Sequence, residues 1–185
     1  MQTPTKLNWE QFLAEAARHT PETFGLSELK ALVDRLEITP ALFEGKLQFC
    51  PEAYARNLLF KNELFEAICL CWQDDQRTSV HNHGRSFGVV VVFEGVMREE
   101  IFRRVEGDRL TLVHTRDITP ESGLAAAPIG MIHRLGNAGG AGSHLVSLHF
   151  YAGPLDEMDV FDLETGTAYR KPMRYLSDGD LPPTS

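Results

Sequence analysis

The sequence lacks several features that would place the protein in a special class. It has no apolar run near the roughly 18 residues that a membrane span needs, and residues 1–8 contain no apolar core of a signal peptide. Its three cysteines, an odd number, do not suggest a disulfide framework. Basic residues are scarce, 18 against 26 acidic ones, and the net charge of -8 argues against wide binding to a phosphate backbone. These absences predict a cytoplasmic protein with reduced thiols and with no membrane or nucleic-acid partner, and nothing implies a protein partner.

The remaining composition is that of a folded domain. Hydrophobic residues make up 43% and charged residues 24% of the 185 residues, which predicts one domain over residues 1–185 with a substantial core. Within it we expect helices over residues 1–50, a β-barrel over residues 51–170 and a loosely held tail over residues 171–185. Seven histidines stand out, because neutral imidazole is the commonest metal ligand.

The first fifty residues show helical spacing of apolar side chains. One apolar stripe begins at Trp9, and a second begins at Leu29, shortly after Ser27. Serine is a preferred residue at helix N-termini, so Ser27 is the expected N-cap of the second helix. Thr39-Pro40 indicates the start of a third, short helix. This part of the chain is therefore expected to pack as helices on the barrel.

From about residue 53 the apolar pattern changes to the alternation that is typical of strands. Ile68, Leu70 and Trp72, for example, alternate with Cys69 and Cys71. Further short apolar segments follow at close spacing, separated by turn signals and without helices between them. The pattern predicts an antiparallel sandwich or barrel, so the fold class is mainly β.

Two histidine motifs narrow this fold class. His81 and His83 are two residues apart, so on a strand they would point to the same face. Residues 128–137 fit the pattern Pro-x-Gly-x-x-His-x-x-x-Asn without a gap, with His133 as the histidine. This pattern is the second motif of the cupins, small double-stranded β-helix barrels (jelly rolls), and His81, His83 and Gly95 fit the later part of the first motif. A cupin barrel with N-terminal helices packed on it is therefore expected.

The glutamate of the first cupin motif is missing, since Phe87 and Gly88 stand where it should be. The chain thus offers three neutral imidazoles, those of His81, His83 and His133. Three protein ligands leave about three positions of an octahedral ion open, and these can take substrate and dioxygen. The site keeps the charge of the ion and would attract an anion such as a thiolate. Zinc also accepts three histidines, so a non-redox cupin, either a zinc- or manganese-dependent isomerase or a ligand-binding sensor, stays open as an alternative.

Two further segments bear polar residues on one face of a strand. Ser147, His149 and Tyr151 alternate with apolar residues, and such a row facing the barrel interior must be hydrogen-bonded within itself. A solvent-exposed face is the alternative. Tyr54 and Arg56 share a face if the chain is extended there, and arginine is the side chain best shaped to bind a carboxylate.

Taken together, these segments resemble the cysteine dioxygenase family of thiol dioxygenases. The resemblance covers residues 54–151 and rests on motifs in family order: residues 54–58, 70–72, 79–83, Gly95, residues 132–134, Asn137 and residues 147–151. It implies non-haem Fe(II) held by His81, His83 and His133, with a small-molecule thiol and O2 as substrates. It further implies that L-cysteine is oxidised to cysteine sulfinic acid.

The same resemblance implies roles for the other residues. Arg56, helped by Tyr54, would bind the substrate carboxylate, and Leu70 and Trp72 match pocket-side positions. Tyr151, oriented by His149 and Ser147, would donate a hydrogen bond near the iron. Arginine at position 56 favours cysteine, whereas relatives acting on 3-mercaptopropionate tend to have glutamine there. Another thiol carboxylate, 3-mercaptopropionate or mercaptosuccinate, remains the alternative substrate.

The chain departs from the family pattern at two positions. Animal members have a cysteine five residues after the second histidine, where it forms a thioether with the tyrosine. Gly88 occupies that position here, so Tyr151 is expected to remain uncrosslinked, as is common in bacterial members. The residue between the first two histidines is Asn82, where aspartate is usual, and we expect a minor effect because it points away from the metal.

The remaining histidines and cysteines receive no functional role. His19, His114 and His144 have no motif partner, and their roles stay open. Cys50, Cys69 and Cys71 are interpreted as small buried residues, since a single Cys-x-Cys without a second pair does not indicate a zinc site. Residues 139–142 are interpreted as a flexible turn and not as a phosphate-binding loop.

Overall fold

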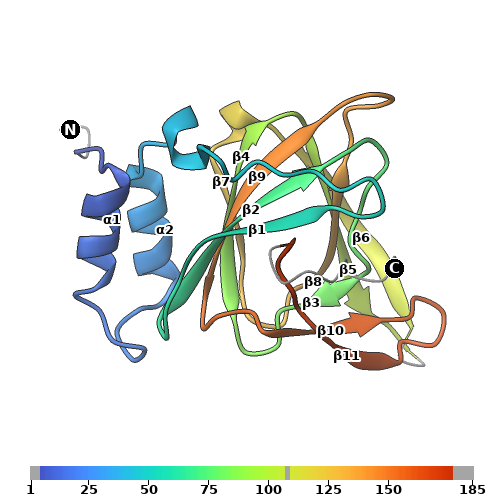
Figure 1. Ribbon diagram of the computed structural model, residues 1–185. Helices are drawn as coiled ribbons and strands as arrows, with labels where there is room; N and C mark the ends of the chain where they lie inside the picture. Colours follow the sequence, from blue (N-terminus) through green and yellow to red (C-terminus); the bar gives the residue numbers. More distant parts are fainter. Residues whose placement is uncertain (1–4, 107–108, 177–185) are drawn as a thin grey trace.

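Strands dominate the computed structural model, which describes residues 5–106 and 109–176. One sheet has five strands in the order β1 (Ala55–Lys61), β2 (Phe65–Trp72), β9 (Leu145–Ala152), β4 (Phe87–Glu94) and β7 (Leu124–Ala127). The other has six, in the order β11 (Ala168–Pro172), β10 (Glu157–Phe161), β3 (His81–Asn82), β8 (Ile132–Asn137), β5 (Met97–Arg104) and β6 (Leu110–Ile118). Figure 1 shows the two sheets facing each other, and every pairing between neighbouring strands is antiparallel. The predicted class, a mainly β double-stranded barrel with N-terminal helices, is confirmed.

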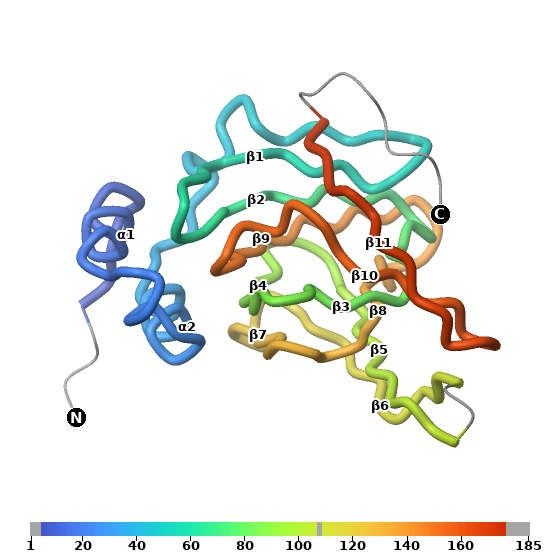
Figure 2. The backbone as a smooth tube through the Cα atoms, turned by 90° about the horizontal axis from the view of Figure 1, so that it is seen from below, coloured from blue at the N-terminus to red at the C-terminus, as the bar shows by residue number. Residues whose placement is uncertain are grey.

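The helices cover the outer face of the five-stranded sheet (Figures 1 and 2). They are α1 (Trp9–Ala16) and α2 (Leu26–Arg35), with two short 3-10 helices, η1 (Pro40–Phe43) and η2 (Pro120–Ser122). Phe12 of α1 is fully buried, and its ring lies 5.9 Å from that of Phe65 in β2 and 5.5 Å from that of Phe150 in β9. The predicted apolar stripes therefore form the contact of the helices with the sheet, and Pro40 begins a third short helix as expected.

The predicted N-cap of the second helix was wrong by two residues. The helix begins at Leu26 with Gly25 as its N-cap, and Ser27 lies inside the first turn. The physical reason is that the carboxylate of Glu28 accepts a hydrogen bond from the backbone N–H of Gly25 at 3.1 Å. This contact caps the helix from within, so no side chain at the N-cap position is needed.

Strands β2 and β9 are buried along their whole length, because they have an apolar layer on each side. The outward side chains of both strands, among them Cys69, Cys71 and Leu148, pack in the core beneath the helices. The inward side chains of β2, Ile68, Leu70 and Trp72, belong to a second core between the two sheets. The interpretation of these cysteines as small buried residues agrees with this packing, and all three cysteines are free thiols.

The loosely held tail expected over residues 171–185 is fixed by contacts in its described part, residues 171–176. Lys171 and Pro172 end strand β11, and the segment that follows turns back toward β1 (Figure 2). The hydroxyl of Tyr175 donates a hydrogen bond to Glu66 in β2, which fixes the segment to the five-stranded sheet. Residues 177–185 lie outside the described residues.

No helix in the described part of the chain is long and apolar enough to cross a membrane. The assignment of residues 1–185 to one domain stays a prediction.

Candidate metal centre and substrate pocket

Three histidines meet inside the barrel. His81 lies in β3 and pairs directly with His133 in β8, while His83 follows β3 by one residue. Each has only 2–3% of its surface exposed, and one ring nitrogen from each lies within 4.8 Å of the others. The i, i+2 spacing predicted one shared face for His81 and His83, and the antiparallel pairing of β3 with β8 adds His133.

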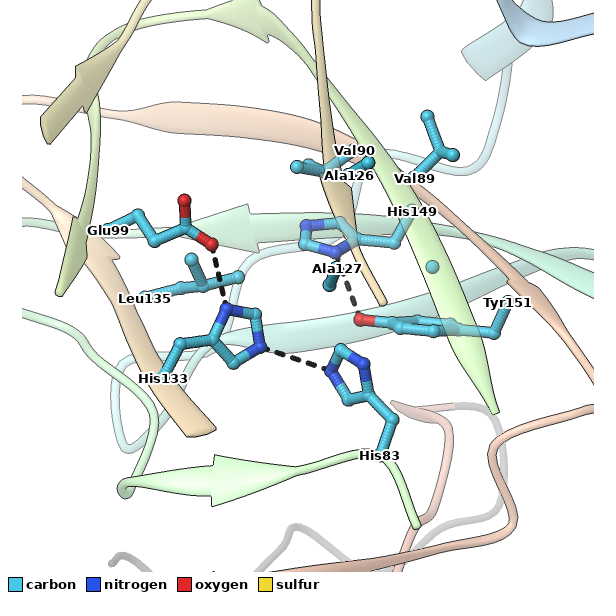
Figure 3. A pocket seen from close by; sticks show the side chains of 11 residues that line it. His83, Val89, Val90, Glu99, Ala126, Ala127, His133, Leu135, His149 and Tyr151 are labelled. Atoms are coloured by element: carbon cyan, nitrogen blue, oxygen red, sulfur yellow. Dashed lines mark hydrogen bonds and ion pairs between the residues drawn. The ribbon is translucent and has the colours of Figure 1, made fainter. Parts of the chain in front are cut away.

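Hydrogen bonds at the outer ring nitrogens orient two of the three imidazoles. The Nδ1 of His81 is 2.9 Å from the carbonyl oxygen of Ser79, and the Nδ1 of His133 is 2.8 Å from a carboxylate oxygen of Glu99. These oxygens can only accept, so each Nδ1 carries the proton and each Nε2 keeps a free lone pair. The Nε2 atoms of His83 and His133 are 3.2 Å apart and point toward each other (Figure 3).

The charge state of the histidines suits a metal ion. Burial, together with the neighbouring His133, lowers the pKa of His81 to about 3, and burial holds the pKa of His83 well below its usual value. Both rings are therefore neutral at physiological pH. The Nδ1 of buried His83 has no partner among the described residues. Among those residues the cluster contains no carboxylate, which agrees with the absence of the cupin glutamate, and three imidazoles fit Fe(II), Mn(II) or Zn(II).

Glu99 is a site residue that the sequence analysis missed. It lies in β5, is 2% exposed, and also accepts a hydrogen bond from Arg116 at 2.6 Å. Burial opposes its ionisation, but the contacts with His133 and Arg116 outweigh burial and hold the pKa of Glu99 below its usual value. A carboxylate on the outer nitrogen of a metal-ligating histidine fixes the ring and raises its basicity. The alternation in β5 could have indicated a buried position for Glu99, because Glu99 is two residues from apolar Met97 and shares its inward face.

Replacing Glu99 by glutamine is expected to weaken metal binding by about 10- to 100-fold, the usual cost of losing such a partner. A titration of the metal-free variant with Fe(II) or Zn(II) against a competing chelator measures this affinity. Glu100→Gln is the matched control, since Glu100 is next in sequence but pairs with Arg134 at 2.6 Å. Equal affinities of the Glu99 variant and the unmodified protein would show that the carboxylate does not tune His133.

The row of Ser147, His149 and Tyr151 faces the barrel interior and is hydrogen-bonded throughout. The Oγ of Ser147 is 2.9 Å from Nε2 of His149, and Nδ1 of His149 is 3.1 Å from the hydroxyl of Tyr151. The indole N–H of Trp72 donates to Ser147 at 3.0 Å. The alternative of a solvent-exposed face is wrong, because all three residues of the row are at most 5% exposed.

One direction of this relay leaves the phenol of Tyr151 as a free donor. The indole of Trp72 donates to Ser147, and the hydroxyl of Ser147 can in turn donate to Nε2 of His149. In that tautomer Nδ1 of His149 donates to the oxygen of Tyr151, whose own O–H is left to donate elsewhere. Burial holds the pKa of His149 well below its usual value and raises that of Tyr151, so both stay neutral. The ring of Tyr151 packs edge-on against that of His83 at 4.9 Å, which places the phenol beside the metal cluster.

Gly88 gives the ring of Tyr151 its space. The two residues are opposite each other in β4 and β9, and a Cβ added at Gly88 would lie 2.9 Å from two ring carbons of Tyr151. A cavity of about 10 Å³ adjoins the histidines here, lined by His83, Gly88, Val89, Val90, Glu99, Ala126, Ala127, His133, Leu135, His149 and Tyr151 (Figure 3).

Replacing Gly88 by alanine is expected to displace the ring of Tyr151 and to lower the free energy of unfolding by about 1–3 kcal/mol, as overpacking usually does. Chemical denaturation of the two proteins measures the difference. Because the displaced phenol also loses its place beside His83, catalytic turnover should fall as well. An unchanged stability would mean that the strand moves freely enough to admit a methyl group.

Arg56 is buried beside this cluster. Only 5% of its surface is exposed, and its Nε has no hydrogen-bond partner among the described residues. Its positive charge contributes to lowering the pKa of His149, which shows that the guanidinium lies within electrostatic reach of the relay. A buried guanidinium with a free donor suits an anionic ligand. Nη2 of Arg56 lies 3.5 Å from Glu66, a second site residue that the sequence analysis missed.

The other predicted pocket residues lie in one core of the barrel, and Leu70 is the partner of Arg56 in the pairing of β1 with β2. Tyr54 stacks on Trp72 with ring centroids 4.4 Å apart, and Leu70 belongs to the same core between the sheets. The structure thus brings together all ten predicted residues. The histidines without a motif partner lie outside this group: His114 and His144 are exposed, and His19 packs against Phe24.

Comparisons with known sequences agree on one family. The sequence model of the family described as cysteine dioxygenase type I matches residues 20–164. Cysteine dioxygenase type 1 of Rattus norvegicus is 28% identical over 94% of this chain and 90% of its own length, and that of Homo sapiens is 27% identical over 82% and 77%. Among solved structures, an RmlC-like cupin protein from Desulfovibrio desulfuricans matches 58% of this chain and 90% of its own with a TM-score of 0.40 and 23% identity.

Proposed function

The chain belongs to the cysteine dioxygenase type I family, and on this premise we propose that it uses Fe(II) and O2 to oxidise L-cysteine to cysteine sulfinic acid. The observation that carries the proposal is the meeting of three buried histidines, an unpaired donor of Arg56 and the Tyr151 relay around one interior site. In the net reaction both atoms of O2 end on the sulfur of the thiol.

His81, His83 and His133 would hold the iron through their Nε2 atoms. When bound there, Fe(II) supplies the electron-transfer chemistry with dioxygen that amino-acid side chains lack. The ligand set adds no charge to the site, so the pocket would favour a thiolate over a neutral thiol. Glu99 would keep the ring of His133 in position through its hydrogen bond to Nδ1.

Arg56 would bind the carboxylate of cysteine through its free Nε donor. A charge-assisted hydrogen bond in a buried pocket is strong, and it fixes the carboxylate at one end of the substrate. Tyr54 and Leu70 would form the wall of the pocket, and the Tyr54 ring is itself held by its stacking on Trp72. The thiol is thereby directed toward the three histidines.

Tyr151 would donate a hydrogen bond at the reacting atoms. Its pKa is raised by burial, so it remains a phenol with a proton to donate at physiological pH. His149 and Ser147 are positioning residues in this proposal, because they act on the substrate only through the hydroxyl of Tyr151. The proposed location is cytoplasmic, which the three free cysteines support.

The test is oxygen consumption by protein loaded with Fe(II) under anaerobic conditions. We expect one O2 to be taken up for each L-cysteine, with cysteine sulfinic acid identified by mass spectrometry. Parallel assays with 3-mercaptopropionate and mercaptosuccinate compare the other thiol carboxylates, whose carboxylates Arg56 could also bind. The proposal fails if the iron-loaded protein shows no oxygen uptake with any of these thiols.

A further inference from the structure

A buried carboxylate lies beside the arginine of the substrate pocket. Glu66 has 0% of its surface exposed, although glutamate is one of the residues least often buried. It lies in β2 directly opposite Tyr151 in β9, and paired residues of neighbouring strands point to the same face. Glu66 therefore stands on the inner face of the barrel, next to the phenol of the catalytic relay.

The contacts of Glu66 are those of a carboxylate anion held in place. Its Oε1 is 3.5 Å from Nη2 of Arg56 and accepts the backbone N–H of Leu155 at 3.1 Å. Its Oε2 accepts the hydroxyl of Tyr175, whose ring also lies 5.6 Å from the guanidinium of Arg56. Burial and the hydrogen bond to Glu66 raise the pKa of Tyr175 to about 12, so this donor keeps its proton. Three donors, one of them cationic, thus surround the carboxylate.

The carboxylate changes the charge of the pocket. The negative charge of Glu66 offsets the positive charge of Arg56, as that of Glu99 is offset by Arg116, and imidazole ligands add no charge, so only the charge of a divalent metal ion remains. A thiolate together with one carboxylate neutralises that ion completely. A substrate with a second carboxylate leaves the pocket with one net negative charge, which is costly in a buried site.

From this charge balance we propose that Glu66 is a specificity-determining residue that restricts the pocket to thiols carrying a single carboxylate. This inference rests on the proposed function and narrows its substrate class. Glu66 contacts Arg56 through Nη2, so Nε of Arg56 stays free for the one substrate carboxylate. Tyr175 and Leu155 keep Glu66 in place when that carboxylate enters.

The first test needs no variant and no turnover. Zinc-loaded protein is titrated with L-cysteine and with mercaptosuccinate in a calorimeter, and cysteine is expected to bind at least about tenfold more tightly. Equal affinities, or tighter binding of mercaptosuccinate, would overturn the proposal.

The second test removes the charge of Glu66. In Glu66→Gln, the ratio of kcat/KM for cysteine to that for mercaptosuccinate is expected to fall by about tenfold or more, with the same shift in the ratio of the Kd values of the zinc form. Glu66→Asp keeps the charge and should keep the preference. Glu15→Gln is the matched control, since Glu15 pairs with Arg35 at 2.6 Å in the helical layer.

Each outcome has a separate meaning. Equal losses on both substrates in Glu66→Gln would make Glu66 a purely structural residue and overturn the proposal. If Glu66→Gln oxidises cysteine and its preference for cysteine over mercaptosuccinate is unchanged, the proposal is overturned as well, but the proposed function stays intact. Only a failure of the unmodified iron protein to oxidise any thiol would contradict the proposed function itself.

Discussion

Replacing His83 by alanine is expected to abolish metal binding and thiol oxidation together. The variant keeps two of the three imidazoles, and two ligands do not hold a divalent ion against water at micromolar concentration. We expect the metal content of the purified protein to fall below about a tenth of the unmodified level and kcat/KM to fall by more than about a thousandfold. Metal analysis and oxygen uptake measure the two effects.

His114→Ala is the matched control for this experiment. His114 is an exposed residue of β6, and its removal should change neither the metal content nor the oxygen uptake. The variant of His83 should also stay folded, because Nδ1 of His83 has no partner in the described part of the chain and the variant loses only the contact of its Nε2 with His133. Full metal content in His83→Ala would contradict the ligand set proposed for the iron.

Replacing Arg56 by glutamine is expected to lower kcat/KM for cysteine by at least about thirtyfold, since breaking a buried charged contact costs about 2–5 kcal/mol. The expected loss is small for cysteamine, which has the thiol and the amine of cysteine but no carboxylate. Oxygen-uptake kinetics with the two thiols measure the difference. Similar losses on both thiols would indicate that Arg56 holds the pocket together and does not bind the substrate.

The double variant Arg56→Gln with Glu66→Gln separates these two roles. In the Arg56→Gln variant Glu66 stays buried without its cationic partner, which lowers the free energy of unfolding by about 3–5 kcal/mol. Removing both charges should restore much of that stability, as measured by thermal unfolding, without restoring the use of cysteine. Recovery of cysteine oxidation in the double variant would contradict carboxylate binding by Arg56.

Much of the fold could be predicted from local patterns. The alternation in β2 and β9 predicted strands, and the identity of the alternate residues separated an apolar face from a polar one at residues 147–151. Helix boundaries were less well determined, because the cap of α2 depends on the reach of the Glu28 side chain and not on the residue type at the N-cap. A side-chain contact likewise fixes residues 173–176 to the sheet, although the sequence alone assigned them to a loosely held tail.

The sequence by itself predicted the three histidines and the polar row, the first from two motifs and the second from its alternation along a strand. Residues two apart share a face, so spacing alone groups His81 with His83 and groups the row that ends at Tyr151. Only the tertiary structure determined which acidic residues contact the site. Glu99 reaches His133 across the pairing of β5 with β8, and Glu66 reaches Arg56 across that of β1 with β2. In the sequence both are ordinary glutamates of a strand, and only the register of the neighbouring strand and the exclusion of water distinguish them from surface charges.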